Sequence, residues 1–262
     1  MKILDGTEVA EYIKERHIRQ SASLRMMPKL LILHDSKTPA GSVYLRAKQN
    51  YGEDIGVEVI VREVATEDLM TTIQNLGADD EVTGIIVQLP LSDSSYTDKA
   101  LAAIPESKDI DGLHTPPGTK GSQDPYQSAT PKGIIWLLAA YNVELRDKQI
   151  VVLGQGRLVG APLSDILEAS GYKVDRLDVD SADIKKRVLA ADIIIAATGQ
   201  PENLSSDMVK QGAIVVDAGS PLSELSPDLA TRSDITKTPN PGGVGPMTVA
   251  ALFDNLLIAA GS

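Results

Sequence analysis

The stretch that decides the fold covers residues 149–178 and reads QIVVLGQGRLVGAPLSDILEASGYKVDRLD. An apolar run enters a turn that contains Gly154, Gly156 and Gly160, and a helical pattern then leads to a second apolar run that ends at Asp178. Glycines at such a turn let backbone N–H groups approach a pyrophosphate at the positive end of the helix. The spacing G-x-G-x-x-x-G is one residue longer than the usual fingerprint. We interpret the stretch as a dinucleotide-binding unit; the alternative is a purely structural turn.

Asp178 follows Gly154 by 24 residues and closes the second apolar run. A carboxylate at this place accepts hydrogen bonds from an adenosine ribose and repels a 2′-phosphate. Asp175 and Asp180 lie close by in the sequence, so a solvated loop acid is the equal alternative. The glycines alone do not separate NAD from NADP.

Outward from this stretch, short apolar runs alternate with helical patterns along the whole chain. These runs predict seven buried strands of parallel sheets, and therefore an α/β fold with right-handed crossovers. Residues 114–131, rich in Gly, Pro, Ser and Thr, separate three strands from four. We therefore expect a first domain over residues 1–127 and a Rossmann-type second domain over 128–244. The predicted strands are 30–33, 57–61, 84–89, 149–154, 172–177, 192–197 and 213–218.

Composition and charge exclude several classes of protein. The chain has 262 residues, with 25 Lys and Arg against 36 Asp and Glu, a formal net charge of −11. Such an acidic chain does not suit sequence-independent binding of nucleic acid. Without any cysteine it has no disulfides, thiolate metal sites or cysteine nucleophile. No apolar run reaches the length of a membrane span, and the N-terminal segment lacks the pattern of a secretory signal. We expect a cytoplasmic protein with no metal and no membrane partner.

The first half carries a different group of polar residues. Tyr44 and Lys48 are four residues apart in a helical pattern, so they share one face of that helix. Gln88 lies near the end of a buried strand, and Asp109 and Asp111 flank the loop of KDIDG. Parallel sheets present functional residues at the carboxyl ends of their strands. An amide, a carboxylate, a lysine and a tyrosine together predict a pocket, although each residue alone has a structural alternative.

At this point the chain resembles the bifunctional methylenetetrahydrofolate dehydrogenase/methenyltetrahydrofolate cyclohydrolase family over nearly its whole length. The segment PGGVGPMT is very specific to that family, and QLPL followed by KDIDG adds to it. The resemblance is carried by ILDGTEVAEYIKER, TPAGSVYLRAK, VTGIIVQLPL, PESKDIDGLH, ATPKGIIWLL, RLVGAPLSDIL, IIIAATGQP, AIVVDAG and TPNPGGVGPMTVAALFDN.

The resemblance implies a two-step enzyme of one-carbon metabolism that supplies purine, methionine and histidine biosynthesis. It would oxidise 5,10-methylenetetrahydrofolate with NAD or NADP, and then hydrolyse the methenyl product to 10-formyltetrahydrofolate. It further implies a homodimer, and a C-terminal helix, residues 245–262, that packs back on the first domain.

The resemblance also assigns roles to residues. Lys48 would activate water and move protons, Gln88 would hold Lys48, Tyr44 would pack on the folate, and Asp111 would bind the pterin. The remaining substrate residues would be Gly242, Gly243 and Pro246. The cofactor residues would be Gly154, Gln155, Gly156, Gly160, Asp178, Thr198, Gly199, Gly219 and Ser220.

Several residues depart from the family pattern. Gln155 stands where the family usually has an arginine, and Asp178-Val179 replaces a His-Ser pair. Both changes remove groups that favour NADP, the family default, so the loop leans towards NAD. Gly41 replaces a serine near the lysine, and the segment after Gly219 is shorter than usual. Two alternatives follow: an NAD-dependent dehydrogenase with weak or no cyclohydrolase activity, and a folate- or nucleotide-binding protein that has lost catalysis.

Overall fold

The computed structural model describes residues 2–38, 42–116 and 125–261, apart from the side chains of residues 42 and 43. The departure at Gly41 therefore lies outside the described residues. The chain divides into two compact units, each built from two segments. We call Met1–Ala10 with Thr130–Thr248 the six-stranded unit, and Glu11–Ala129 with Val249–Ser262 the three-stranded unit.

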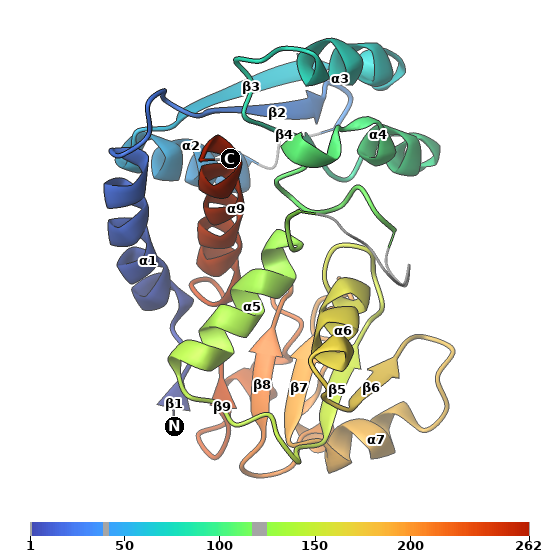
Figure 1. Ribbon diagram of the computed structural model, residues 1–262. Coiled ribbons are helices and arrows are strands. Elements are labelled where there is room, and N and C mark those ends of the chain that lie inside the picture. Colours follow the sequence, from blue (N-terminus) through green and yellow to red (C-terminus); the bar gives the residue numbers. More distant parts are fainter. Residues whose placement is uncertain (1, 39–41, 117–124, 262) are drawn as a thin grey trace. The chain divides into compact units, whose positions relative to one another are not determined.

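Helices and strands alternate along the chain (Figure 1). The elements are β1 (Lys2–Ile3), α1 (Gly6–Ser21), β2 (Lys29–Asp35), α2 (Ser42–Ile55), β3 (Glu58–Val64), η1 (Thr66–Asp68), α3 (Leu69–Gly77), β4 (Gly84–Gln88), η2 (Ser94–Tyr96), α4 (Thr97–Ala103), η3 (Glu106–Lys108), α5 (Ala129–Ala140), β5 (Ile150–Leu153), α6 (Gly160–Ala169), β6 (Val174–Leu177), α7 (Ile184–Ala190), β7 (Ile193–Ala196), η4 (Ser206–Met208), β8 (Ile214–Asp217), α8 (Pro227–Ala230), β9 (Thr236–Lys237) and α9 (Val244–Ala260).

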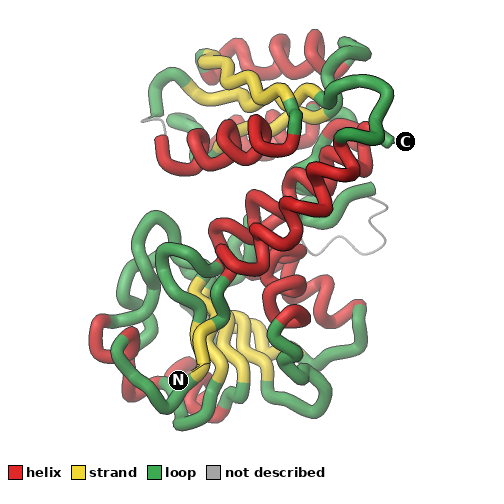
Figure 2. The backbone as a smooth tube through the Cα atoms, turned by 90° about the vertical axis from the view of Figure 1, so that its left-hand side faces the viewer, coloured by secondary structure: helices red, strands yellow, loops and turns green. Residues whose placement is uncertain are grey.

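The three-stranded unit is a parallel sheet of order β3-β2-β4 with helices on both faces (Figure 2). Leu31, Leu33 and Ile85 face one side, where they pack in one core with α3 and α4. Gly84 faces the other side, and a Cβ there would lie 2.8 Å from Leu256 of α9. Burial on both faces explains why these strands read as continuous apolar runs.

Polar contacts tie the C-terminal half of α9 to the rest of the three-stranded unit. The side-chain amide of Asn255, itself buried, donates to the carbonyl oxygens of Ile110 at 2.8 Å and Gln127 at 2.9 Å. One residue earlier, Asp254 lies 3.3 Å from Nε2 of the buried His17. Because Asn255 satisfies two backbone carbonyls at once, it anchors the loop around Ile110 to α9.

The six-stranded unit is a parallel sheet of order β1-β9-β8-β7-β5-β6. All seven strands predicted from apolar runs are present, with no end more than three residues from its predicted position, and the α/β fold class is confirmed. The structure adds β1 and β9, which pair with each other in parallel. We expected residues 1–127 to form one domain, whereas β1 joins the sheet of the second half. Two-residue strands are too short to show a hydrophobic period, so sequence did not predict them.

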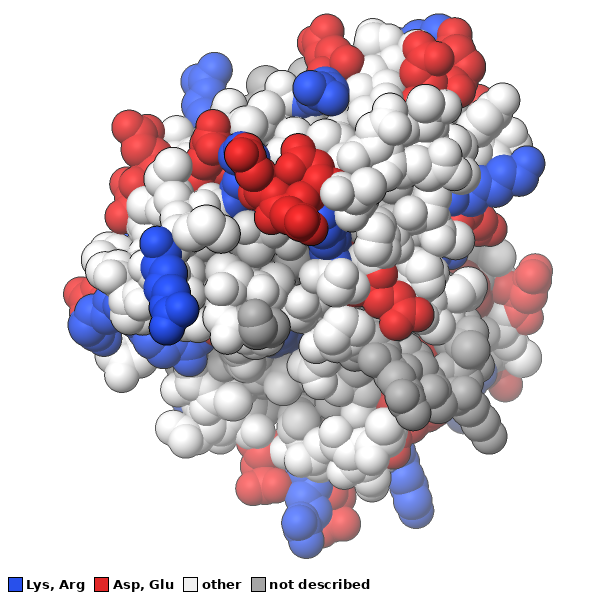
Figure 3. All heavy atoms as spheres, turned by 45° about the horizontal axis from the view of Figure 1, so that its top comes forward, with Lys and Arg blue, Asp and Glu red and all other residues white. Residues whose placement is uncertain are grey.

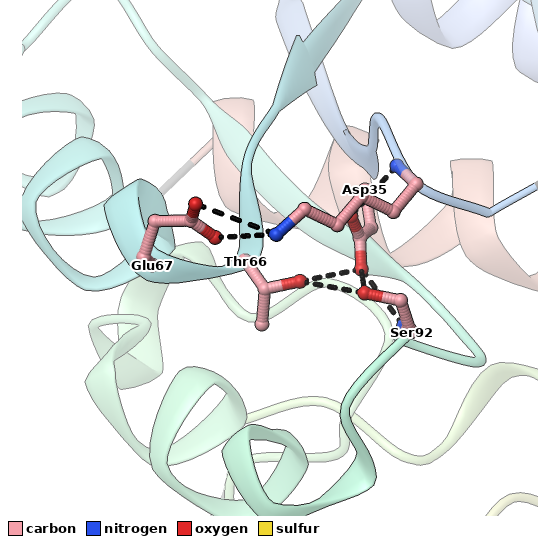
Figure 4. A network of polar contacts seen from close by, with 5 residues as sticks. Asp35, Thr66, Glu67 and Ser92 are labelled. Atoms are coloured by element: carbon pink, nitrogen blue, oxygen red, sulfur yellow. Dashed lines mark hydrogen bonds and ion pairs between the residues drawn. The ribbon is translucent and has the colours of Figure 1, made fainter.

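A buried carboxylate holds the three strand ends of the three-stranded unit together (Figure 4). Asp35 ends β2, and its Oδ2 accepts from the hydroxyl of Thr66 after β3 at 2.6 Å. The same oxygen accepts from the backbone N–H of Ser92 at 2.8 Å and from the Ser92 hydroxyl at 2.6 Å. Oδ1 accepts from the backbone N–H of Lys37 at 3.0 Å. Burial alone would raise the pKa of Asp35, but the hydrogen bonds from Ser92, Thr66 and Lys37 outweigh it and hold the pKa well below its usual value.

We predict that Asp35→Asn destabilises the protein by about 2–3 kcal/mol, because an amide cannot accept from all of these donors. Since the native pKa is lowered, the stabilisation by Asp35 is present above the pKa of the unfolded chain and is lost as pH falls towards the native value. The urea midpoints of wild type and variant should therefore differ most near neutral pH. Asp93→Asn, which changes an exposed acid that caps η2, is the control and should shift the midpoint little. Equal midpoints for wild type and Asp35→Asn would contradict the prediction.

No helix among the described residues has the length and apolar character needed to cross a membrane. On the face shown in Figure 3, acidic and basic side chains are interspersed.

Candidate functional site

The three-stranded unit brings Lys48 and Gln88 together. Lys48 lies on α2, and only 8% of the residue is exposed. Its Nζ donates to Oε1 of Gln88, the last residue of β4, at 3.0 Å. The amide nitrogen of Gln88 donates to the carbonyl oxygen of Leu89 at 3.1 Å, which turns Oε1 towards the lysine. Tyr44 lies one turn before Lys48 on the same helix and is half-buried. The pairing expected from sequence is therefore present in the geometry.

The electrostatics of Lys48 involve Asp111. Burial lowers the pKa of Lys48, and the negative charge of Asp111 partly opposes that shift. Burial likewise raises the pKa of Asp111, and the charge of Lys48 opposes it. The two groups are thus close enough to influence each other's ionisation. A lysine with a lowered pKa has a larger neutral fraction, and a neutral amine can accept a proton.

The loop that carries Asp111 is shaped by a second acid, Asp109. Oδ2 of Asp109 accepts from the backbone N–H groups of Leu113 at 2.7 Å and His114 at 2.6 Å. Burial raises the pKa of Asp109 to about 6, against the lowering effect of these backbone hydrogen bonds. Gly112, between Asp111 and these donors, has a φ of 65°, and a Cβ there would lie 2.7 Å from the backbone nitrogen of Ser128. Asp109 therefore orders the backbone around Asp111.

The turn after β5 contains three glycines, of which two are required by the packing and one borders open space. Gly154 has a φ of 91°, and a Cβ there would lie 2.4 Å from the carbonyl oxygen of Ala197. A Cβ on Gly160, the first residue of α6, would lie only 1.8 Å from the carbonyl oxygen of Gly154. A Cβ on Gly156 would meet no atom within 4 Å. Two of the glycines are thus required by the fold, and the third leaves space for a ligand beside its backbone.

Gln155 and Asp178 differ in what their side chains contact. The amide of Gln155 donates to the carbonyl oxygen of Val152 at 3.0 Å, and its Oε1 accepts from Ser164 at 3.4 Å, so the side chain turns inward. Asp178 is exposed at the end of β6, and its Oδ1 accepts from the next backbone N–H at 2.9 Å. The neighbouring Asp175 instead pairs with Arg187. Asp178 thus keeps carboxylate surface for a ligand.

Two more expected cofactor pairs follow the neighbouring strands. Thr198 and Gly199 follow β7, and Gly219 and Ser220 follow β8. The carboxyl ends of β5, β6, β7 and β8 belong to one parallel sheet, so these turns lie on the same edge. In the described ranges, no group of three His, Cys, Asp or Glu residues is placed to hold a metal ion.

The expected substrate residues Gly242 and Gly243 are closely packed against the start of α1. A Cβ on Gly6 would lie 1.8 Å from the carbonyl oxygen of Gly243, and the backbone N–H of Thr7 donates to the carbonyl oxygen of Gly242 at 3.0 Å. Pro246 lies in the first turn of α9. At the loop itself, Gly242 has a φ of 104°, and a Cβ on Gly243 would lie 2.5 Å from the carbonyl oxygen of Pro239, so both positions need glycine. The substrate role of all three residues remains a prediction.

Comparisons with known proteins bear on both units. The model described as "Tetrahydrofolate dehydrogenase/cyclohydrolase, catalytic domain" matches residues 4–111, and the one described as "Tetrahydrofolate dehydrogenase/cyclohydrolase, NAD(P)-binding domain" matches residues 128–262. The bifunctional protein FolD of Thermus thermophilus is 36% identical over 275 residues, covering 99% of this chain and 96% of that protein.

Solved structures agree with these matches. The bifunctional enzyme FolD of Campylobacter jejuni is 32% identical with a TM-score of 0.88, and the match covers 100% of this chain and 99% of that one. The FolD of Trypanosoma brucei, solved with NADP cofactor and an inhibitor, is 28% identical with a TM-score of 0.88, over 99% of this chain and 97% of that one.

Fold, site and comparisons together define an α/β enzyme with a Rossmann-type unit for a nicotinamide dinucleotide and a catalytic unit for a folate. The chain belongs to the tetrahydrofolate dehydrogenase/cyclohydrolase family.

We predict that two glycine substitutions in one turn have opposite effects. Gly156→Ala should fold with nearly unchanged thermal stability, because its Cβ enters open space at an ordinary φ, yet it should weaken dinucleotide binding. Gly160→Ala should destabilise the protein by about 3 kcal/mol or more, because its Cβ meets backbone that cannot move aside. Thermal unfolding and NADH titration, run on both variants, test the pair. A Gly156→Ala protein that binds NADH like wild type would remove the argument for ligand approach at that glycine.

Proposed function

We propose that Lys48 is the central group of the cyclohydrolase reaction, in which water converts 5,10-methenyltetrahydrofolate to 10-formyltetrahydrofolate. The observation that carries this assignment is the buried Nζ of Lys48, held at 3.0 Å by Gln88 and electrostatically coupled to Asp111. A buried amine beside a cationic substrate has two reasons to be neutral at neutral pH, namely desolvation and repulsion by the substrate.

The proton transfers of this step pass through one nitrogen, Nζ of Lys48. Neutral Lys48 accepts a proton from water as the water oxygen bonds to the methenyl carbon, which gives a neutral carbinolamine. The bond from that carbon to N5 then breaks, as the hydroxyl proton is lost and N5 is protonated. Water contributes two hydrogens, of which one ends on N5 and one leaves as a free proton. Gln88 holds Nζ in place through both transfers, and Asp111 and Tyr44 orient the folate.

The dehydrogenase step precedes this hydrolysis. A bound nicotinamide dinucleotide would supply the acceptor for the hydride of the methylene carbon of the folate, and the substrate nitrogens would stabilise the resulting cation. The protein then needs no strong acid or base for this step, only positioning. We assign the pyrophosphate to the turn of Gly154, Gly156 and Gly160, where the helix N-terminus favours an anion.

We further propose that NAD is preferred over NADP. Gln155 is neutral and turned inward, so it supplies no positive charge for a 2′-phosphate. The exposed carboxylate of Asp178 accepts hydrogen bonds from a free ribose and repels a phosphate there. The chain would then differ from its Trypanosoma relative, which was solved with NADP.

We make three further assignments. Residues 1–127 with helix 245–262 would form the folate-binding catalytic domain, apart from the strand β1, and residues 128–244 would form the cofactor domain. The family models support these two parts over residues 4–111 and 128–262, and the part of α9 from Val249 onward belongs to the three-stranded unit. We further propose a homodimer, which the family resemblance implies, and a cytoplasmic location.

We predict that Lys48→Met lowers the rate of methenyltetrahydrofolate hydrolysis by at least about 100-fold, because the proton acceptor is lost. In wild type, this activity should rise with pH as Nζ loses its proton, and the rise should come at lower pH than for an ordinary lysine because burial lowers the pKa. The variant should lose the rise. Absorbance of the methenyl substrate, followed without cofactor, measures both effects.

Lys99→Met removes an exposed lysine of the same unit and should hydrolyse like wild type. Equal hydrolysis by wild type and Lys48→Met would refute the role of the lysine. Oxidation of methylenetetrahydrofolate by a wild type that hydrolyses nothing would instead identify a dehydrogenase without cyclohydrolase activity.

For the cofactor, we predict that Asp178→Ser combined with Gln155→Arg shifts the ratio of kcat/KM values towards NADP by about tenfold or more. The change removes a repulsive charge and adds a cation near the 2′-position. Steady-state oxidation of methylenetetrahydrofolate with each cofactor measures the ratio. An unchanged ratio would dismiss the proposed selector, and the single variants separate the two contributions.

A further inference from the structure

Glu224 is a buried acid outside every role assigned so far. It lies in the segment between β8 and α8, and only 1% of the residue is exposed. Oε2 accepts from the backbone N–H of Thr198 at 2.9 Å and from its hydroxyl at 2.7 Å, and Oε1 accepts from the backbone N–H of Gly199 at 2.7 Å. One side chain therefore binds three donors of the turn that follows β7.

These contacts determine the conformation of that turn. The Thr198 hydroxyl donates to Glu224 and accepts from the backbone N–H of Gln200 at 3.1 Å, so its orientation is set on both sides. Gly199 has a φ of 71°, and a Cβ there would meet no atom within 4 Å. The turn is thus rigid on the side of Glu224 and open on the other side.

A second buried acid, Asp217, orders the backbone after the next strand, β8, in the same way. Oδ1 of Asp217, the last residue of β8, accepts from the backbone N–H of Gly219 at 2.9 Å and of Glu224 itself at 3.1 Å. Oδ2 accepts from the hydroxyl of Ser223 at 2.6 Å. Asp217 therefore holds the backbone of Glu224 while Glu224 holds the turn of Thr198.

The contacts of the Glu224 side chain among the described residues are these three hydrogen bonds, with no ion pair. Burial of a carboxylate is unfavourable unless its oxygens are satisfied, and here all three donors come from one turn. An acid in this position orders two successive backbone N–H groups, which an apolar residue could not do.

We propose that Glu224 is a positioning residue for cofactor binding, acting through the turn of Thr198 and Gly199. The proposal rests on the proposed function. The turn after β5 would take the pyrophosphate and the end of β6 the adenosine ribose, and a dinucleotide crosses the sheet edge at the point between β5 and β7. The nicotinamide half would then lie along the ends of β7 and β8, where Glu224 and Asp217 order the backbone.

The bifunctional reaction supplies an internal control, because hydrolysis of methenyltetrahydrofolate needs no cofactor. Glu224→Gln keeps the shape of the side chain but places an amide N–H group where a backbone N–H now donates. We expect it to raise the Kd for NADH, measured by titration calorimetry, about five- to tenfold. The amide of Gly199 should exchange its hydrogen faster in the cofactor-free variant, and hydrolysis should stay within twofold of wild type. Glu202→Gln, at an exposed glutamate, is the matched control and should change none of these values.

A double-mutant cycle separates positioning from a general loss of structure. Thr198→Val removes the hydroxyl that Glu224 binds, whereas Thr198→Ser keeps it. If Glu224 acts through Thr198, the effects of Glu224→Gln and Thr198→Val on the Kd should be non-additive by at least about threefold. The proposal would be overturned if Glu224→Gln bound NADH with the Kd of wild type, or if the effects of Glu224→Gln and Thr198→Val on the Kd were additive.

If Glu224→Gln does not fold, the two Thr198 variants decide the question: weaker NADH binding by Thr198→Val than by Thr198→Ser supports the proposal, and equal binding overturns it. Failure of the proposed function looks different, because wild type itself would then bind and turn over neither cofactor.

Discussion

Unpaired backbone N–H groups at the carboxyl ends of parallel strands are the constraint on which both units depend. Where a strand stops, the following turn exposes donors that no neighbouring strand accepts, and in a buried edge these donors need an acceptor. The chain meets this need repeatedly with a buried carboxylate that accepts two of them. Three acids bind backbone donors that follow strand ends in this way: Asp35, Asp217 and Glu224. Asp109 does the same in the loop after η3 that carries Asp111.

The surroundings of the buried amine of Lys48 differ from those of the buried acids. The short hydrogen bonds to Asp35 favour its charged form, whereas Lys48 donates to the neutral oxygen of Gln88. An amide oxygen compensates a buried ammonium less than a carboxylate would. Asp111 is coupled to the lysine but is itself driven towards its neutral form by burial. The same unit thus keeps the charge of Asp35 fixed and leaves one amine able to change its protonation state.

The sequence predicted the parts of the structure that depend on local pattern. Buried parallel strands show continuous apolar runs, so all seven longer strands were found, and the spacing of Tyr44 and Lys48 followed from helical geometry. β1 and β9 could not be found, because their pairing depends on residues at opposite ends of the chain.

The supporting side chains of the candidate site were harder to predict. Glu224 lies in a stretch of Ser, Pro and Leu that reads as an exposed loop, and nothing local marks its carboxylate as buried. The inward turn of Gln155 depends on Ser164, nine residues further along α6. No local pattern of the sequence therefore marks either side chain.

The pairing of β1 with β9 has a consequence for the order of folding. β1 is made long before β9, and the three-stranded unit needs the helical residues from Val249 onward. Neither unit is therefore complete when its central strands have been made, and those strands must form before the segments that finish them arrive. Closing the two chain ends onto early-formed sheets requires contacts of the longest sequence separation, which slow folding. Until then, the edge of β8 in one unit and the α9-facing side of the sheet in the other stay uncovered, and they are the surfaces a chaperone would meet on the nascent chain.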